Sequence, residues 1–110
     1  MKYLPRKRPA TLILIGALAL AASGQSLATG DASAGKEKAQ SLGCVSCHGR
    51  EGISANPMYP NLAGQKGLYL LKQLKAFKHK ERTNPIMLSQ AKGLSDQDMK
   101  DLASYFNSLR

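Results

Sequence analysis

CVSCHG, residues 44–49, is the stretch that decides what this chain can fold around. Two cysteines three positions apart, with a histidine directly after the second, are the attachment signature of a c-type haem. Each thiol can form a thioether with one vinyl group of the porphyrin, and the adjacent histidine can then bind the iron from one face. We therefore predict thioether bonds from Cys44 and Cys47, and an axial iron ligand at His48.

Two other uses of these residues fit the rest of the sequence less well. A thioredoxin-like dithiol needs a βαβ context, and no segment alternates in the manner of a strand. A structural zinc site needs four ligands, whereas the chain has no third cysteine and only one other histidine, His79. His79 stands between Lys78 and Lys80, which indicates a surface position.

The N-terminal segment is typical of a secretory signal peptide. Four bases lie within residues 2–8, an apolar run covers residues 11–22, and small residues precede a cleavage site after Ala28. An uncleaved anchor is the alternative, but about a dozen apolar residues fall short of the roughly 20 that a membrane span needs. We therefore expect residues 1–28 to be removed, with residues 29–110 forming one periplasmic domain that has no stable membrane insertion.

The charge of the chain restricts its partners. Sixteen Lys and Arg stand against 7 Asp and Glu, and because residues 1–28 hold four bases and no acid, residues 29–110 keep 12 bases against 7 acids, or +5. Nucleic acid binding is not expected, because the location is wrong and no recognition motif is present. Six bases and one acid, Glu81, lie within residues 66–82. This density favours redox partners with acidic docking surfaces.

The periodicity of the sequence predicts an all-α domain. Apolar residues recur at helical spacing over residues 31–42, 68–79 and 95–109, whereas residues 49–64 and 82–93 are rich in glycine, proline and polar residues and are predicted to be irregular. A domain this small has a thin apolar core. A large buried haem would compensate for it, so we predict three to four short helices wrapped around one covalently attached haem.

The order of these features resembles the class I cytochrome c family, in particular the small bacterial monohaem proteins and one half of the dihaem cytochrome c four. The resemblance rests on the CVSCHG motif, on YPNLAGQ at 59–65, on the helical segment 69–77 and on GLSDQDMKDLASYF at 93–106. It covers essentially all of residues 29–110. It implies the class I cytochrome c fold, one covalent haem c, and electron transfer instead of catalysis.

The resemblance also implies roles for single residues. Pro60 matches the proline whose carbonyl accepts a hydrogen bond from Nδ1 of the ligand histidine, and Leu62 matches a residue that packs on the haem. Gly35 and Tyr105 match a close crossing of the first and last helices. One departure is visible: the aromatic residue common one turn after that glycine is Ala39 here.

The resemblance implies that one of the methionines is the sixth iron ligand. Met99 lies on the apolar face of the last predicted helix, which indicates a core position. Met58 lies in the loop that also carries Pro60, and that loop is expected on the histidine side of the haem. Met87 matches the ligand position of the family. We therefore predict Met87 as the ligand, with Met58 as the alternative; a neutral thioether favours ferrous iron and raises the reduction potential.

These features predict a monomeric, periplasmic one-electron carrier between a respiratory or dehydrogenase donor and a terminal oxidase or reductase. A haem subunit bound permanently to an oxidoreductase is an alternative. A five-coordinate haem sensor or peroxidase is another, although residues 83–93 offer no histidine, acid or arginine. Tyr69, Gln65 and Arg82 are candidates for contacts to the haem propionates.

Overall fold

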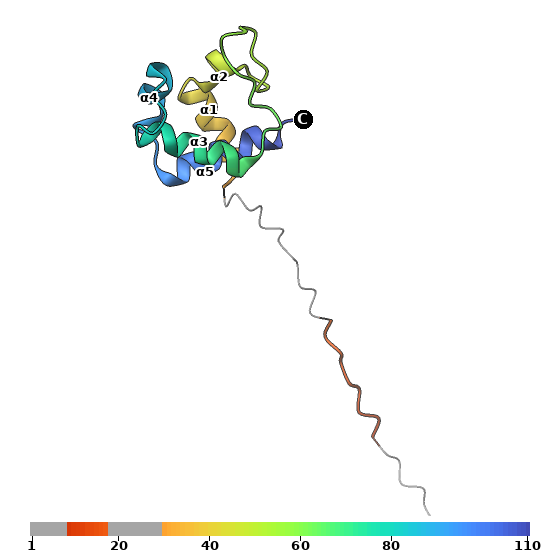
Figure 1. Cartoon of the computed structure of the whole chain (residues 1–110). Coiled ribbons are helices and arrows are strands. Elements are labelled where there is room, and N and C mark those ends of the chain that lie inside the picture. The colour runs from red at the N-terminus through yellow and green to blue at the C-terminus, as the bar shows by residue number, and fades with distance from the viewer. Residues whose placement is uncertain (1–8, 18–29) are drawn as a thin grey trace, which may run out of the picture.

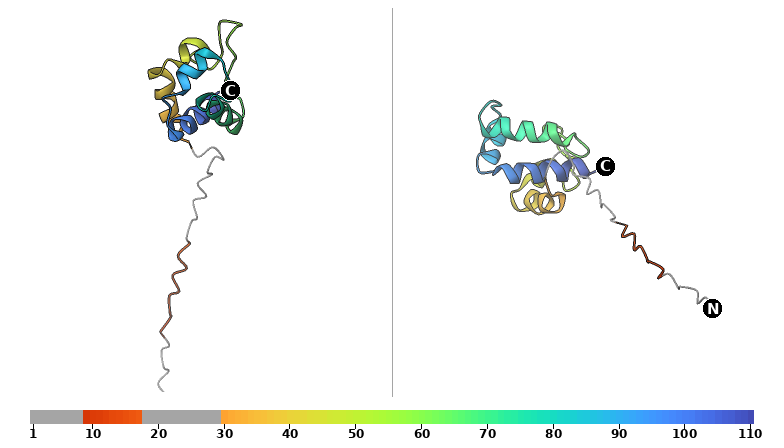
Figure 2. Two further views of the ribbon diagram at one scale, coloured as in Figure 1. Left: turned by 60° about the vertical axis from the view of Figure 1, so that its left-hand side comes forward. Right: turned by 90° about the horizontal axis from the view of Figure 1, so that it is seen from below.

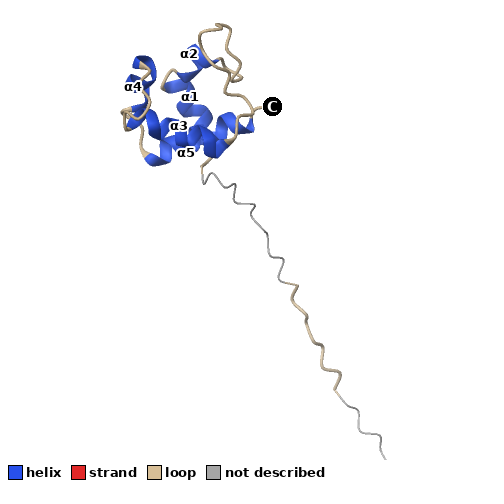
Figure 3. Cartoon of the chain, in the orientation of Figure 1, coloured by secondary structure: helices blue, strands red, loops and turns tan. Residues whose placement is uncertain are grey.

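The computed structural model describes residues 9–17 and 30–110, so the predicted cleavage after Ala28 lies outside the described residues. These residues form five helices and no strand, which confirms the all-α prediction with one helix more than expected (Figures 1 and 3). None of the described helices is long and apolar enough to cross a membrane. The helices are α1 (Ala32–Ser41), α2 (Cys44–His48), α3 (Gly67–Lys78), α4 (Pro85–Ala91) and α5 (Asp96–Ser108).

Helix α5 forms the centre of the domain. It packs against α1 on one side and against α3 on the other, as the right-hand view of Figure 2 shows. Half of the buried apolar residues belong to it, because its apolar positions repeat at helical spacing. The buried apolar residues are Ala39, Leu70, Phe77, Ala91, Leu94, Met99, Leu102, Ala103, Tyr105 and Phe106.

Helices α1 and α5 cross closely because a glycine stands at the contact. A Cβ atom on Gly35 would lie only 2.0 Å from the carbonyl oxygen of Asp101 and 2.8 Å from the Cβ atom of Tyr105. Ala39, one turn further along α1, has no exposed surface. The predicted close crossing is therefore confirmed, and the small residue at position 39 is part of the buried core.

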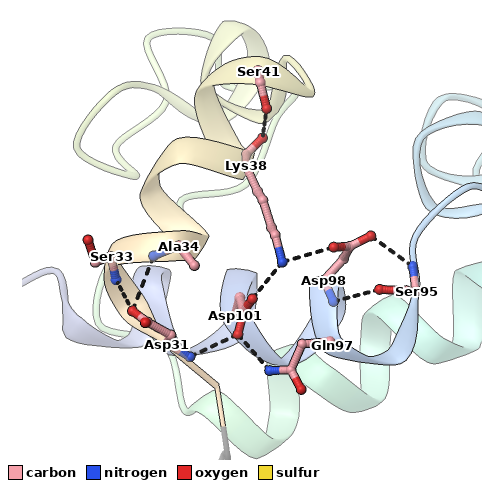
Figure 4. Close-up of polar contacts among 9 residues, drawn as sticks. All are labelled: Asp31, Ser33, Ala34, Lys38, Ser41, Ser95, Gln97, Asp98 and Asp101. Atoms are coloured by element: carbon pink, nitrogen blue, oxygen red, sulfur yellow. Dashed lines mark hydrogen bonds and ion pairs between the residues drawn. The ribbon is translucent and has the colours of Figure 1, made fainter.

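A cluster of polar side chains joins the same two helices (Figure 4). The ammonium group of Lys38 lies 2.9 Å from a carboxylate oxygen of Asp98 and 2.5 Å from one of Asp101. The other carboxylate oxygen of Asp101 accepts hydrogen bonds of 2.8 Å from the backbone N–H of Asp31 and from the side-chain amide of Gln97. Asp101 is only 3% exposed. Its carboxylate thus ties the start of α1 to α5.

Both carboxylates of this cluster have a pKa below the usual range. For Asp98, the hydrogen bond from Lys38 is the largest cause. For Asp101, burial taken alone raises the pKa, but hydrogen bonds from Lys38, Asp31 and Gln97 together outweigh it. A carboxylate with a depressed pKa stabilises the folded state above the pKa of the unfolded chain, and this stabilisation is lost as the pH falls through the folded-state pKa.

The prediction of an irregular segment over residues 82–93 is wrong for Pro85–Ala91, which forms α4. The side chain of Asn84 caps this helix by accepting hydrogen bonds from the backbone N–H groups of Ile86 and Met87, at 3.0 and 3.1 Å. Pro85 occupies the first helical turn, where its missing N–H costs no hydrogen bond. The Asn-Pro pair that suggests a loop in the sequence therefore starts a helix.

Candidate functional site

The described domain contains a cavity of about 580 Å³, a volume within the range of about 300–1,000 Å³ that is common for ligand pockets. Residues of α2, α3, α4 and α5 line it, together with the loop after α2. Most of the surface of its wall is apolar. The apolar side chains from α3 and α5 that line it are Leu70, Leu74, Phe77, Leu102, Ala103 and Phe106.

The cysteines and the histidine of the CVSCHG motif line this cavity together. They can do so because the motif itself forms α2, a short helix that follows Gly43 in the left-handed conformation. Cys44 and Cys47 are half-buried and are not joined in a disulfide. Burial is the main cause that raises the pKa of the Cys44 thiol. A raised pKa is the opposite of what a reactive redox dithiol requires.

His48 is held in one orientation. It is only 8% exposed, and its Nδ1 atom lies 2.8 Å from the carbonyl oxygen of Pro60. Because a carbonyl oxygen can only accept a hydrogen bond, Nδ1 must carry the proton in this contact. In the neutral imidazole Nε2 then keeps its lone pair and is available as a metal ligand.

Hydrogen bonds fix the loop that presents the Pro60 carbonyl. The carbonyl oxygen of Gly52 accepts bonds from the backbone N–H groups of Leu62 and Ala63, at 2.8 and 3.0 Å. The side chain of Asn61 accepts a bond of 2.7 Å from the backbone N–H of Ser54. Both contacts join the two arms of the loop, and they bring Leu62 to the cavity wall beside Pro60.

Gly49, directly after the motif, starts this loop. Its φ of 85° lies in the region that L side chains rarely adopt, and a Cβ atom there would lie 1.9 Å from the carbonyl oxygen of Ile53. A glycine is therefore required where the chain turns away from α2.

The methionines have different surroundings. Met99 is fully buried in the core and does not line the cavity. Met58 and Met87 both line it, but Met58 is 82% exposed whereas Met87 is half-buried on α4. Within the described domain α2 and α4 do not contact each other, although both contribute to the cavity wall. His48 and Met87 therefore approach the cavity from two separate walls.

All of the residues predicted for the site line this one cavity. They are Cys44, Cys47, His48, Pro60, Leu62 and Met87. The candidates for propionate contacts, Tyr69, Gln65 and Arg82, line it as well, whereas His79 is exposed and does not.

Gln73 also lines the cavity and was not among the predicted residues. Its position, four residues after Tyr69 and four before Phe77 on α3, is the sequence signal that could have identified it.

The donor groups of the cavity fit a haem that is bound covalently. Two thiols, an imidazole with a free Nε2 and a thioether surround an apolar space. Arginine, glutamine and tyrosine side chains on its wall supply hydrogen-bond donors, which suit the carboxylate groups of the porphyrin.

Comparisons with known proteins identify the family of the chain. The family model described as Cytochrome c matches residues 32–110. Cytochrome c-554(548) of Halomonas halodenitrificans is 43% identical over 82 residues, which cover 72% of this chain and 96% of the relative. Cytochrome c4 of Pseudomonas aeruginosa is 46% identical over 91 residues, which cover 83% of this chain and 44% of the relative.

A solved structure has the same fold. The structure of reduced recombinant cytochrome c4 from Pseudomonas stutzeri superposes with a TM-score of 0.68 and 41% sequence identity, over 74% of this chain and 46% of that one. The chain thus spans nearly the whole length of cytochrome c-554(548) and about half the length of the cytochromes c4.

Proposed function

The chain belongs to the cytochrome c family, whose domain binds haem c covalently, and from this premise we propose that it is a periplasmic one-electron carrier with His48 and Met87 as the two axial ligands. The observation that carries this proposal is the convergence of both cysteines, His48 and Met87 on one largely apolar cavity. An electron carrier, unlike an enzyme, needs no open coordination position for a substrate.

Each residue of the site has a task in this proposal. Cys44 and Cys47 provide the thioether links. The carbonyl oxygen of Pro60 holds the imidazole of His48 through Nδ1. This contact keeps the imidazole in one tautomer, in which Nε2 can bind the iron. Met87 offers a neutral thioether, which favours the ferrous state. When bound, haem iron supplies the reversible gain and loss of one electron.

The apolar wall supports the same function. The core residues Leu70 and Phe106 are buried and line the cavity, so they keep water away from its interior. With both axial ligands in place the surroundings need not rearrange when the charge changes, which suits fast electron exchange.

The removal of residues 1–28 as a signal peptide is also part of the proposal. We expect the periplasmic protein to start at Thr29, after removal of residues 1–28. The described domain begins close to this point, where the backbone N–H of Asp31 donates to the buried carboxylate of Asp101.

The redox partners are expected to present acidic surfaces to the lysines around α3. Of the lysines in residues 66–82, Lys66, Lys72 and Lys80 are exposed. The ammonium group of Lys78 donates instead to the carbonyl oxygen of Leu94, which removes it from the docking surface. Electron transfer to such a partner should slow as salt rises, because the attraction is screened. Rates that do not depend on salt would contradict this docking surface.

The ligand assignment is tested by the near-infrared absorption of the oxidised, haem-loaded protein. Sulfur ligation of ferric haem by methionine produces a weak charge-transfer band, which we expect in the wild type and in Met58→Ala but not in Met87→Ala. Met58→Ala is the matched control, since it removes the other methionine of the cavity wall at a position that is 82% exposed.

Two outcomes would overturn the proposal. Loss of the band in Met58→Ala alone would move the sixth ligand to Met58. If the wild type lacks the band and its reduced form binds carbon monoxide readily, the sixth position is open, and a sensor or peroxidase becomes the better description.

A further inference from the structure

The helix that carries Met87 is short and has few contacts with the rest of the domain. Helix α4 has seven residues, and among the described helices it contacts only α3. Ala91 is its one buried residue. A helix of this length is not stable by itself in water, because few hydrogen bonds compensate for the cost of its first turn. Contacts at the start of α4 are therefore important for the position of Met87.

Asn84 holds the backbone on both sides of Met87. Its side-chain oxygen accepts hydrogen bonds from the backbone N–H groups of Ile86 and Met87, at 3.0 and 3.1 Å. Its carbonyl oxygen accepts a third bond, of 2.8 Å, from the backbone N–H of Leu88. Consecutive N–H groups, with that of Met87 in the middle, thus all donate to one residue. Asn84 also lines the cavity, as do Ile86, Met87 and Gln90.

The turn before Asn84 is tied to α3. The backbone N–H groups of Glu81 and Arg82 donate to the carbonyl oxygen of Ala76, at 2.8 and 3.1 Å. The side chain of Arg82 donates a hydrogen bond of 2.9 Å to the side-chain oxygen of Gln73 on α3. A single residue separates this turn from Asn84. Asn84 therefore connects a fixed turn to the first turn of α4.

We propose that Asn84 is a positioning residue for the sixth iron ligand, and that its contacts with the first turn of α4 strengthen the bond between Met87 and the iron. The proposal rests on the proposed function, because it requires Met87 as a ligand. Without the side-chain acceptor at position 84, the N–H groups of Ile86 and Met87 lose their partner within the protein. Conformations in which the thioether lies away from the iron then become more populated.

A cap that only stabilises the fold would have the same contacts, so a second cap is needed for comparison. The side chain of Ser95 accepts a hydrogen bond of 3.0 Å from the backbone N–H of Asp98 at the start of α5. Ser95 does not line the cavity, and α5 carries none of the proposed iron ligands. Loss of the Ser95 cap should therefore affect stability but not ligation.

The test measures how tightly the oxidised, haem-loaded protein binds imidazole, by optical titration, because imidazole has to displace Met87 from the ferric iron. The usual cost of replacing a cap by alanine corresponds to about fivefold in an equilibrium constant. We therefore expect Asn84→Ala to bind imidazole about fivefold more tightly than the wild type. Asn84→Ser, which keeps an acceptor, should stay close to the wild type. Ser95→Ala should lower the unfolding temperature but leave the affinity for imidazole unchanged.

Three results would contradict the role of Asn84. If Asn84→Ala lowers the unfolding temperature and leaves the imidazole affinity unchanged, the cap is structural only. Equal increases in Asn84→Ala and Ser95→Ala would reflect a general loss of stability. An affinity of Asn84→Ser equal to that of Asn84→Ala would show that the side-chain acceptor is irrelevant.

Failure of the proposed function would be seen separately. It would appear in the wild type itself, as a missing methionine band or as ready binding of carbon monoxide, before any of these variants is compared. When the band is present in the wild type and absent in Met87→Ala, the imidazole titration tests the role of Asn84 alone.

Discussion

Replacement of Gly35 by alanine should destabilise the domain, because the close crossing of α1 and α5 leaves no room for a Cβ atom. That atom would lie 2.0 Å from the carbonyl oxygen of Asp101, whereas ordinary contacts start at 3.4 Å, so the helices would have to separate by about 1.4 Å. The nearest atoms belong to backbone and cannot rotate away. Separation would also stretch the contacts of Lys38 with Asp101.

The size of the effect can be estimated from two opposing contributions. Overpacking a well-packed contact costs about 1–3 kcal/mol and sometimes more, and here a backbone has to move. Alanine regains about 1 kcal/mol, because glycine is a poor residue inside a helix. With the cost at the upper end of this range, we expect a net loss of about 2 kcal/mol in the free energy of unfolding. For a domain of this size, that loss lowers Tm by roughly 8–16 °C.

The assay is thermal unfolding of the haem-loaded protein, followed by far-ultraviolet circular dichroism. Gly93→Ala is the matched control, since a Cβ atom at that position meets nothing within 4 Å and the residue has no positive φ. Its stability should stay within about 0.5 kcal/mol of the wild type. If Gly35→Ala unfolds at the same temperature as Gly93→Ala, the argument from the crossing is refuted.

Three further predictions concern hydrogen bonds and charge. The stability of the wild type should fall as the pH drops below about 4, the ordinary pKa of an aspartate, toward the lower folded-state pKa values of Asp98 and Asp101. The Asp98→Asn/Asp101→Asn double variant should show a flatter pH profile in denaturant titrations. Asn84→Ala removes the N-cap of α4 and should lower the stability of this helix by about 1 kcal/mol, which would appear as faster amide hydrogen exchange in α4. Exchange rates equal to those of the wild type would contradict the role of this cap. Tyr105→Phe removes the hydrogen bond of 3.0 Å to the Arg50 carbonyl. It should lower the free energy of unfolding, measured with guanidinium chloride, by about 1 kcal/mol without changing the visible spectrum.

The three long helices can be predicted from the sequence because their apolar residues repeat over several turns. The expected ranges 31–42, 68–79 and 95–109 differ from α1, α3 and α5 by one residue at each end. Helices α2 and α4 have five and seven residues, too few for an apolar repeat to appear. Only the cap at Asn84 and the following proline signal α4, and both residues are also common in turns.

The residues of the cavity wall were largely predictable, whereas their mutual contacts were not. Cys44, Cys47 and His48 are fixed by a motif, and a motif is local in sequence. The contact of Arg82 with Gln73 and the ion pairs of Lys38 with α5 join residues from different segments. Such pairs depend on how the helices are packed, which no single segment specifies.

The contact of α1 with α5 also determines when the chain can fold. It encloses residues 42–95, so the two helices meet only after a loop of about 54 residues has closed. Closing such a loop costs about 3.5 kcal/mol of free energy in lost chain entropy, beyond a constant term. Only the contacts between α1 and α5 can compensate for this cost, so both helices must be present. A nascent chain that still lacks α5 therefore has no route to the native topology. This late closure is compatible with passage across a membrane in an unfolded state, followed by folding once the last helix has emerged.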